Sequence, residues 1–252
     1  ILVGHVTKDG TVAGPRSLEH LVDVVLSFEG DRHSSLRLVR GIKNRFGPSD
    51  EVGCFEQRAD GIHQVSDPSG IFVHEHDDDV PGSVAMVVLD GRRAMVGQIQ
   101  ALMNATTMAS PRRAVSGLDG SRVAMMLAVA EQHCKVTASK HEVYASTVGG
   151  MKVTEPAADL AILLALYSAE RHKPIPREVA AIGEVGLAGE IRRVPSTARR
   201  VAEAKRLGLR HVIVPAGTDE ELPTGIRVSR VANLAQAVDA AVTAHDHSAA
   251  PF

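Results

Sequence analysis

The hydrophobic pattern of the N-terminal third is typical of short strands. A buried strand opens the chain at 1–6, and a short helix from Ser17 leads into the next strand. Further on, apolar and polar residues alternate or form brief apolar runs, separated by the turn sequences Asp60-Gly61 and Pro68-Ser69-Gly70. The predicted strands of this part after the first are 24–28, 36–43, 52–55 and 71–74.

From Ser83 onward the pattern changes to strands that alternate with helices. The predicted strands are 85–89, 94–101, 142–147, 179–184 and 212–214, and the predicted helices are 121–133, 155–171, 197–207 and 234–244. Such alternation predicts an α/β domain of about 160 residues, within the usual size range of domains. The acidic stretch before Pro81-Gly82 predicts a linker, so we expect domains at 1–74 and 83–244, a linker at 75–82 and a frayed tail at 245–252.

Composition limits the classes of protein that fit this pattern. The chain has 252 residues, 44% hydrophobic and 23% charged, with a formal net charge of −2, so binding to nucleic acid would require a local basic patch. No apolar run is long enough for a membrane span, and none forms a signal peptide. Cys54 and Cys134 are far apart and predict neither a disulfide framework nor a zinc site, so we expect a cytoplasmic protein.

The sequence offers few residues in patterns that bind metals or nucleotides. His74 and His76 among acidic residues, and His245 with His247, fit a solvated linker and tail better than a metal site, so no metal is predicted. The phosphate-binding sequence G-x-x-x-x-G-K-[ST] does not occur in the 252 residues. Lys43 and Arg45, in the sequence Lys43-Asn44-Arg45-Phe46-Gly47, place two cations at the end of a strand just before a Gly-Pro turn.

The sequence KNRFG at 43–47 is the signature of the RadA/Sms DNA-repair ATPases. The blocks VGHVTKDG, AGPRSLEH and FEGDR precede it in the order of that family. The resemblance implies that residues 1–74 are the end of a RecA-like ATPase core, which assembles as a hexameric ring with nucleotide between subunits. A P-loop for ATP and Mg²⁺, and a zinc finger, would lie upstream of this chain.

The same resemblance assigns roles to individual residues. His5 corresponds to the sensor of phosphate state, and Lys8 to Arg16 resembles a loop that faces DNA. Lys43 and Arg45 correspond to a cationic finger that reaches the γ-phosphate of the neighbouring subunit. A fixed cation at this place neutralises the charge that spreads over the transferring phosphoryl group.

Residues 83–244 resemble the proteolytic domain of Lon, which has a ribosomal protein S5-like α/β fold. The position of the nucleophilic serine corresponds to Ala157, in the sequence Glu155-Pro156-Ala157-Ala158-Asp159. The position of the general-base lysine corresponds to Ala198. Acyl transfer needs an activated hydroxyl and a base within reach, so two alanines predict a domain without peptidase activity.

A basic cluster lies between residues 190 and 211. It holds Arg192, Arg193, Arg199, Arg200, Lys205, Arg206 and Arg210 against Glu190 and Glu203, with Arg112, Arg113 and Arg122 elsewhere in the domain. One interpretation is a groove for duplex DNA, with Arg192, Arg193, Arg199 and Arg200 as phosphate contacts. The other is the solvated face of an amphipathic helix.

Two functions follow from these patterns. The first is a RadA/Sms-type ATPase of DNA recombination and repair, in which an inactive Lon-like domain serves as scaffold and DNA-binding surface. The second is a module that only holds a ring of subunits together and binds protein partners, such as a recombinase or other repair proteins. On either hypothesis this chain by itself is inactive as an ATPase and as a protease.

Overall fold

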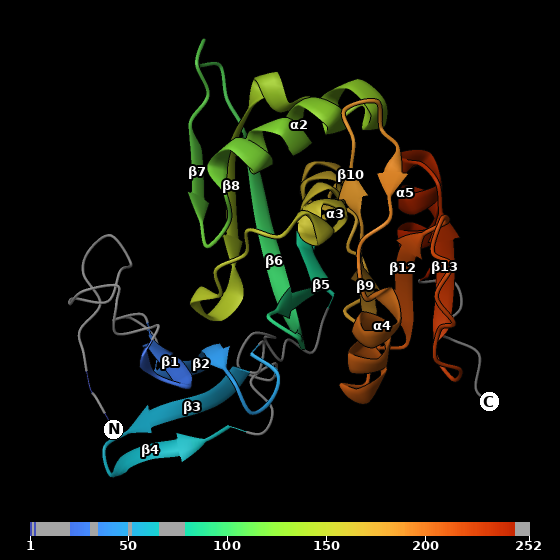
Figure 1. The fold of residues 1–252 in the computed structure, drawn as a ribbon. Coiled ribbons are helices and arrows are strands. Elements are labelled where there is room, and N and C mark those ends of the chain that lie inside the picture. The colour runs from blue at the N-terminus through green and yellow to red at the C-terminus, as the bar shows by residue number, and fades with distance from the viewer. Residues whose placement is uncertain (2, 4–20, 31–34, 50–51, 66–78, 245–252) are drawn as a thin grey trace. The chain divides into compact units, whose positions relative to one another are not determined.

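The computed structural model contains two compact units (Figure 1). It describes the chain except for residues 2, 4–20, 31–34, 50–51, 66–78 and 245–252. One unit consists of Ile1–Ser66 with the turn Gly91–Arg93, and the other of Asp67–Asp90 with Ala94–Phe252. The described residues leave out half of the predicted linker, the strand at 71–74, and most of the strand at 1–6 and of the helix from Ser17.

The first unit is an antiparallel sheet of four strands in sequential order. Its strands are β1 (Val24–Glu29), β2 (Leu36–Asn44), β3 (Val52–Arg58) and β4 (Gly61–Gln64). Cys54 and Val52 of β3 are buried, whereas Leu26 and Phe28 of β1 are 64% and 55% exposed. The sequence predicted β1 to β3, and it missed β4 because the Asp60-Gly61 turn is followed by only four strand residues.

The second unit is built on a mixed sheet of seven strands, in the order β13-β12-β9-β5-β6-β8-β7. Four neighbouring pairs are parallel, β13 with β12, β12 with β9, β9 with β5, and β7 with β8, while β6 and β8 are antiparallel. The strands are β5 (Ser83–Asp90), β6 (Arg93–Ala105), β7 (Arg113–Ser116), β8 (His141–Thr147), β9 (Val179–Ala181), β12 (His211–Pro215) and β13 (Arg227–Val231). The predicted mixed α/β class is therefore confirmed.

Four α-helices pack on this sheet: α2 (Gly120–Cys134), α3 (Asp159–Arg171), α4 (Thr197–Arg206) and α5 (Leu234–Val242). Side chains of Asp119 and Asn233 cap α2 and α5 by accepting from the backbone N–H three residues later, which fixes where each helix begins. Short 3₁₀ turns lie at Ala138–Lys140, Val148–Gly150 and Pro156–Ala158. The first turn of the predicted 155–171 helix is thus a 3₁₀ turn that starts at a proline.

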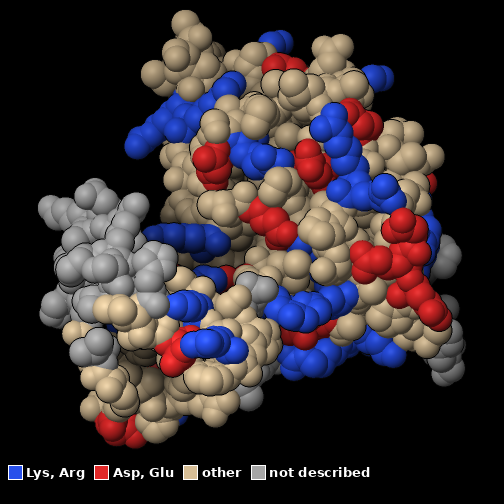
Figure 2. Space-filling view, viewed as in Figure 1, with Lys and Arg blue, Asp and Glu red and all other residues tan. Residues whose placement is uncertain are grey.

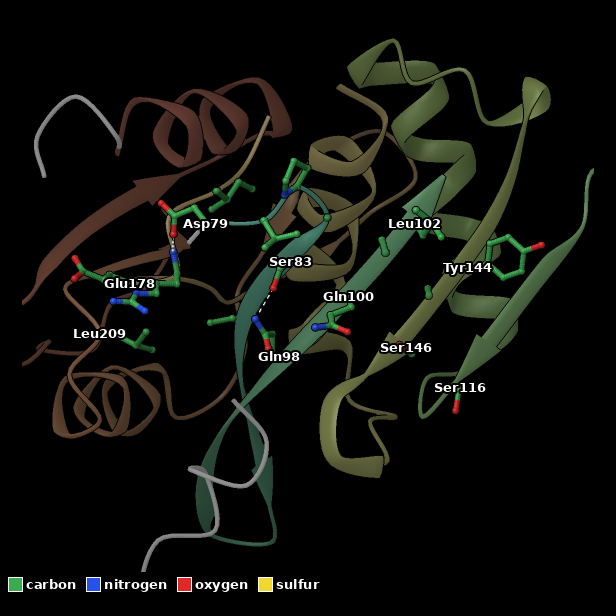
Figure 3. Close-up of a pocket in the computed structure, with 18 of the residues that line it drawn as sticks. Asp79, Ser83, Gln98, Gln100, Leu102, Ser116, Tyr144, Ser146, Glu178 and Leu209 are labelled. Atoms are coloured by element: carbon green, nitrogen blue, oxygen red, sulfur yellow. Dashed lines mark hydrogen bonds between the residues drawn. The ribbon is translucent and has the colours of Figure 1, made fainter. Parts of the chain in front are cut away.

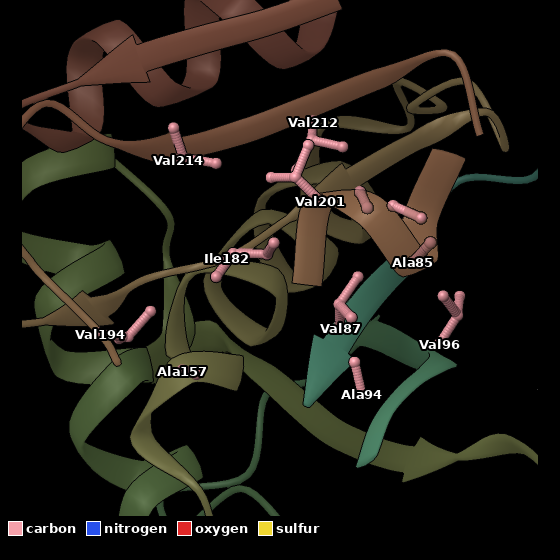
Figure 4. Packing of buried hydrophobic residues seen from close by; sticks show 12 residues of the cluster. Ala85, Val87, Ala94, Val96, Ala157, Ile182, Val194, Val201, Val212 and Val214 are labelled. Atoms are coloured by element: carbon pink, nitrogen blue, oxygen red, sulfur yellow. The ribbon is translucent and has the colours of Figure 1, made fainter. Parts of the chain in front are cut away.

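A cluster of small aliphatic side chains lies between α4 and the sheet (Figure 4). Ala85 and Val87 of β5 and Ala94 and Val96 of β6 belong to it, together with Val201 of α4. Because alternate residues of a strand point to one face, Gln98, Gln100 and Leu102 continue the same face of β6 beyond this cluster. These three side chains are partly or largely exposed, so the cluster does not cover the whole face.

Three elements differ from the sequence prediction. Strands β7 and β13 were not predicted, because both are short and their residues are a mixture of charged, small and apolar types. The predicted strand 179–184 is divided into β9 and the strand β10 (Glu184–Val185), which pairs with β11 (Ile191–Arg192) as an antiparallel hairpin.

Candidate functional site

The 43–47 turn exposes the Arg45 side chain to solvent, and hydrogen bonds hold the backbone of the turn in place. The Asn44 side chain accepts from the Phe46 N–H at 3.1 Å and donates to the Pro48 carbonyl at 3.1 Å, so it closes the turn at both ends. The Arg45 N–H donates to the Asp23 carbonyl at 3.0 Å, and its guanidinium lies 3.1 Å from the Asp23 carboxylate. The Arg45 side chain is still 76% exposed, so it is positioned but accessible.

Lys43 differs from Arg45, although both were predicted to point outward. It lies on β2 opposite Val25, it is half-buried, and its ammonium donates to the Val22 carbonyl at 2.8 Å. The prediction of two outward cations is wrong for Lys43, because the strand continues through Asn44 and only Arg45 enters the turn. Phe46, next to Arg45, is 80% exposed.

The remaining predicted residues of the first unit cannot be placed. His5, Lys8 and Arg16 lie outside the described residues. Their roles as sensor and DNA-facing loop therefore stay predictions that rest on the resemblance alone.

The two alanines that the Lon resemblance assigns to a degenerate protease dyad differ in burial, because Ala157 is buried and Ala198 is partly exposed. Ala157 is 1% exposed, belongs to the cluster under α4, and accepts from the Gly183 N–H through its carbonyl at 2.9 Å (Figure 4). Ala198 lies in the first turn of α4, where its N–H and that of Thr197 each donate to the Glu220 carboxylate at 2.9 Å. A carboxylate of the chain thus occupies the free N–H groups at the start of α4.

A buried ion pair lies beside this position. Arg200 is 0% exposed, and its guanidinium donates to both carboxylate oxygens of Glu155, to the Val87 carbonyl at 2.9 Å and to the Pro195 carbonyl at 3.1 Å. The other partner, Glu155, also accepts from the Leu89 N–H at 2.8 Å. The prediction that Arg200 contacts DNA is wrong, because a fully buried guanidinium whose donors are used inside the domain cannot reach a phosphate.

A second buried pair joins α2 to α3. Asp159 is 0% exposed, and its carboxylate accepts from Arg122 Nε at 2.5 Å and Nη2 at 2.7 Å, and from the Val185 N–H at 3.2 Å. Burial raises the pKa of Asp159 above its usual value, while Arg122 opposes that shift. Asp159 in turn raises the pKa of Arg122. This pair fixes the start of α3 against α2, so Arg122 is a structural cation rather than part of a DNA groove.

The other cations of the basic cluster lie at the surface among carboxylates. Lys and Arg side chains gather over the region of α4, and acidic side chains lie beside them (Figure 2). The ion pairs of the cluster, apart from Arg200 with Glu155, are Arg192 with Glu184 and Glu190, Arg193 with Asp219, Arg206 with Glu203, and Arg210 with Glu178. The excess of positive charge along the sequence is therefore largely neutralised in three dimensions.

Of the four DNA contacts predicted in the basic cluster, three lie at the surface. Arg192 and Arg193 have side chains 56% and 63% exposed, and Arg199 is exposed on α4. Arg199 and Arg200 are adjacent in sequence, but they lie on different sides of the helix, because successive residues of a helix are turned by about 100°. Arg200 shares the buried side of α4 with Val201 and Ala204, and sequence reasoning missed this division.

Sequence reasoning also missed Glu155 as the partner of Arg200. The two residues are 45 positions apart, and no local spacing reveals a pair of that separation. One signal was available: Glu155 and Arg200 each lie two residues from an alanine of the degenerate dyad.

The described part of the chain contains no metal-binding cluster, disulfide or membrane-spanning helix. Among the residues that the structure describes, no group of three or more His, Cys, Asp or Glu side chains could hold a metal ion. Both cysteines are free, and burial raises the pKa of each thiol. None of the described helices is long and apolar enough to cross a membrane.

Comparison with known proteins identifies relatives of this chain. Residues 99–218, which lie within the second unit, match the family described as subunit ChlI of Mg-chelatase. The chain is 54% identical to the DNA repair protein RadA of Mycolicibacterium smegmatis over 238 residues, which are 94% of this chain and 51% of the relative. It is 47% identical to RadA of Pseudomonas aeruginosa over 95% of this chain and 53% of the relative. It is 44% identical to RadA of Escherichia coli over 94% of this chain and 52% of the relative.

These relatives extend beyond the part that matches. The chain spans about half the length of each of them, and the match covers nearly all of this chain, including the 43–47 turn and the α/β unit. The family resemblance that the KNRFG sequence and the blocks before it indicated is therefore confirmed. The chain is therefore a relative of the DNA repair proteins named RadA over nearly its whole length.

Proposed function

We propose that this chain forms part of a RadA-type, DNA-dependent ATPase of recombination and repair. Its first unit would supply the end of a RecA-like core, and its second unit a Lon-like domain that has lost peptidase chemistry. ATP and Mg²⁺ would be bound by a P-loop outside these 252 residues, in a ring of six subunits. The similarity to RadA proteins over nearly the whole chain supports the repair role.

The observation that carries the ATPase proposal is the geometry of Arg45. Phosphoryl transfer needs a cation that is fixed in direction yet free to meet a phosphate from another subunit. Arg45 fits this need, because its backbone is held to Asp23 while 76% of its side chain is exposed. Lys43, bonded to the Val22 carbonyl, supports the backbone of the turn and has a positioning role.

The test uses the full-length protein that contains this chain. Arg45→Ala should reduce DNA-stimulated ATP hydrolysis by about 1,000-fold, the usual range for loss of an arginine finger, with ATP affinity nearly unchanged. Arg58→Ala is the matched control, because Arg58 is an exposed arginine of the same sheet with its own carboxylate partner, Glu56. Normal hydrolysis by Arg45→Ala, or loss of ATP binding alone, would contradict the assignment.

The second unit would act as a scaffold with a DNA-contacting surface. On this proposal Arg192, Arg193 and Arg199 contact phosphates without reading sequence. Two observations support the absence of peptidase activity: neither alanine carries a nucleophile or a base, and Ala157 is buried. The chain alone should therefore hydrolyse neither ATP nor casein.

One observation favours a second candidate function. The carboxylates paired with the basic cluster leave little net positive charge around α4, which suits a surface that joins proteins better than one that holds DNA. In this alternative the second unit holds subunits together and binds protein partners. Measuring DNA binding by the full-length chain, with and without substitutions in the exposed arginines, separates the two.

A further inference from the structure

A groove of about 840 Å³ lies on the face of the sheet that the α4 cluster leaves open (Figure 3). Its floor is formed by β6, β8 and β7, and its opposite wall by the segment before β5, the segment before β9 and the end of α4. All of its lining residues belong to the second unit. This volume is in the range of about 300–1,000 Å³ that is typical of ligand-binding sites.

The floor of the groove carries a row of three polar side chains. Gln100 of β6 pairs in register with Ser146 of β8, which pairs in register with Ser116 of β7. The structure shows no hydrogen bond for these three side chains within the residues it describes. A carboxamide and two hydroxyls therefore face the groove in one line, with both donors and acceptors available.

The next row of the floor is apolar. Leu102 lies in register with Tyr144, which lies in register with Ala114. Leu102 is 56% exposed, and the Tyr144 hydroxyl is held by the Glu142 carboxylate at 3.1 Å, so the ring is fixed beside the leucine. On the opposite wall, Leu207 and Leu209 add further apolar surface. The groove thus offers an apolar row and a polar row side by side.

The charges of the groove argue against nucleic acid. Its charged lining residues are Asp79, Glu178 and Arg177, which together carry one net negative charge. Asp79 accepts from the Arg177 N–H at 2.9 Å, and Glu178 is paired with Arg210 at 3.4 Å. A phosphate backbone needs several cations along its path, and this lining does not provide them. A segment that carries Lys or Arg suits it better.

We propose that this groove binds a short peptide segment of a partner protein. An apolar side chain of the segment packs on Leu102 and Tyr144, its amide or hydroxyl groups bond to Gln100, Ser146 and Ser116, and a Lys or Arg side chain lies toward Asp79 and Glu178. The inference rests on the partner-binding part of the second candidate function and requires neither ATP hydrolysis nor DNA binding.

The experiment is a selection from a random dodecapeptide library displayed on phage, with the full chain as target. Leu102→Arg is the groove variant, because an exposed position tolerates the change and the added cation repels a basic segment. Leu187→Arg is the matched control, because Leu187 is a 69% exposed leucine of the β10–β11 hairpin outside the groove. Gln100→Ala is a second, smaller change that keeps the test valid if the arginine disturbs the fold.

The expected result is enrichment of peptides with an apolar residue near a Lys or Arg. Synthetic versions of these peptides should bind the unchanged chain and the Leu187→Arg control with equal affinity. Their affinity should be more than tenfold lower for Leu102→Arg and several-fold lower for Gln100→Ala. The proposal is wrong if the selection yields no peptide whose binding depends on the groove. Displacement of the peptide by a 30-residue thymidine oligonucleotide would instead assign the groove to nucleic acid. Loss of self-association in Leu102→Arg, measured by sedimentation, would assign it to a second copy of this chain.

A negative outcome here remains distinguishable from failure of the ATPase proposal. The Arg45 experiment reads out hydrolysis, whereas the selection reads out peptide binding to another unit of the chain. The groove proposal fails if the selection fails, even where Arg45→Ala behaves as expected.

Discussion

The Arg200 guanidinium is fully buried and bonds both carboxylate oxygens of Glu155, 45 positions earlier in the chain. The pair joins α4 to the segment before α3, and its remaining donors are taken by backbone carbonyls of Val87 and Pro195. A charged group is stable inside a protein only if it is paired and hydrogen-bonded, and each partner here meets that condition. Arg200 is therefore part of the internal structure of the domain.

Removing Arg200 should destabilise the second unit strongly. Arg200→Ala leaves the Glu155 carboxylate with no cation, and breaking a buried pair in this way costs about 3–5 kcal/mol of unfolding free energy. Arg199→Ala, on the exposed side of the same helix, should change the unfolding free energy by less than about 0.5 kcal/mol. Urea unfolding followed by circular dichroism measures both values, and equal effects would contradict the burial of Arg200.

The proposed DNA surface is tested by charge reversal at Arg193 and Arg199, with Arg200 left intact. If these arginines contact phosphates, the double substitution to Glu should weaken binding of duplex DNA by more than about tenfold at moderate salt. Fluorescence anisotropy over a series of salt concentrations should also show a smaller salt dependence. Lys152→Glu with Lys173→Glu is the control of equal charge, at two exposed lysines outside the basic cluster of the sequence. Equal binding by the two double variants would favour the scaffold alternative.

Gly82 should be irreplaceable by alanine. Its φ is +87°, and a Cβ there would lie 2.1 Å from the Ala101 carbonyl oxygen, while its own N–H donates to Ser168 Oγ. Gly82→Ala should therefore lower the melting temperature by several degrees. Gly120→Ala is the contrasting variant, because a Cβ at this first residue of α2 meets no atom within 4 Å and alanine favours the helix. Thermal unfolding in which both variants melt alike would contradict the turn geometry.

His211 should make the second unit sensitive to acid. Burial, and to a lesser extent the charge of Arg227, lowers the pKa of His211 to about 4. In the unfolded chain the imidazole takes up its proton at the ordinary pKa of about 6.5. The contribution of His211 to the free energy of unfolding is therefore fully present above pH 6.5, and it falls by about 3 kcal/mol as the pH decreases toward 4. His211→Gln keeps a side chain that can bond Ser229 Oγ and should flatten this part of the curve. Urea unfolding at a series of pH values gives the comparison.

Much of the fold could be predicted from local pattern. The helix from Gly120 to Cys134 has an Asp cap and regular apolar spacing, so its position followed from the sequence. Strands β7 and β13 could not be predicted, since four or five residues of mixed character become strands only by pairing with a neighbour that the sequence does not show.

The candidate site was predictable to a smaller extent. The KNRFG sequence predicted Arg45 as a finger, and the resemblance to Lon assigned a lost protease dyad to two alanines; both assignments stay predictions. Burial of Arg200 and the inward direction of Lys43 depend on partners far along the chain, Glu155 and Val22, so local charge counting overestimated the basic surface. The groove on β6, β8 and β7 depends on register between strands, which no single stretch of sequence specifies.

The most direct test of the central claim mixes two inactive forms of the full-length protein. One carries Arg45→Ala, and the other has an intact Arg45 and an inactivated P-loop. If Arg45 acts on ATP bound by the neighbouring subunit, an equal mixture contains complete sites and should recover about one quarter of the wild-type rate of DNA-stimulated ATP hydrolysis. A mixture that stays as inactive as its two components would contradict a finger that acts between subunits.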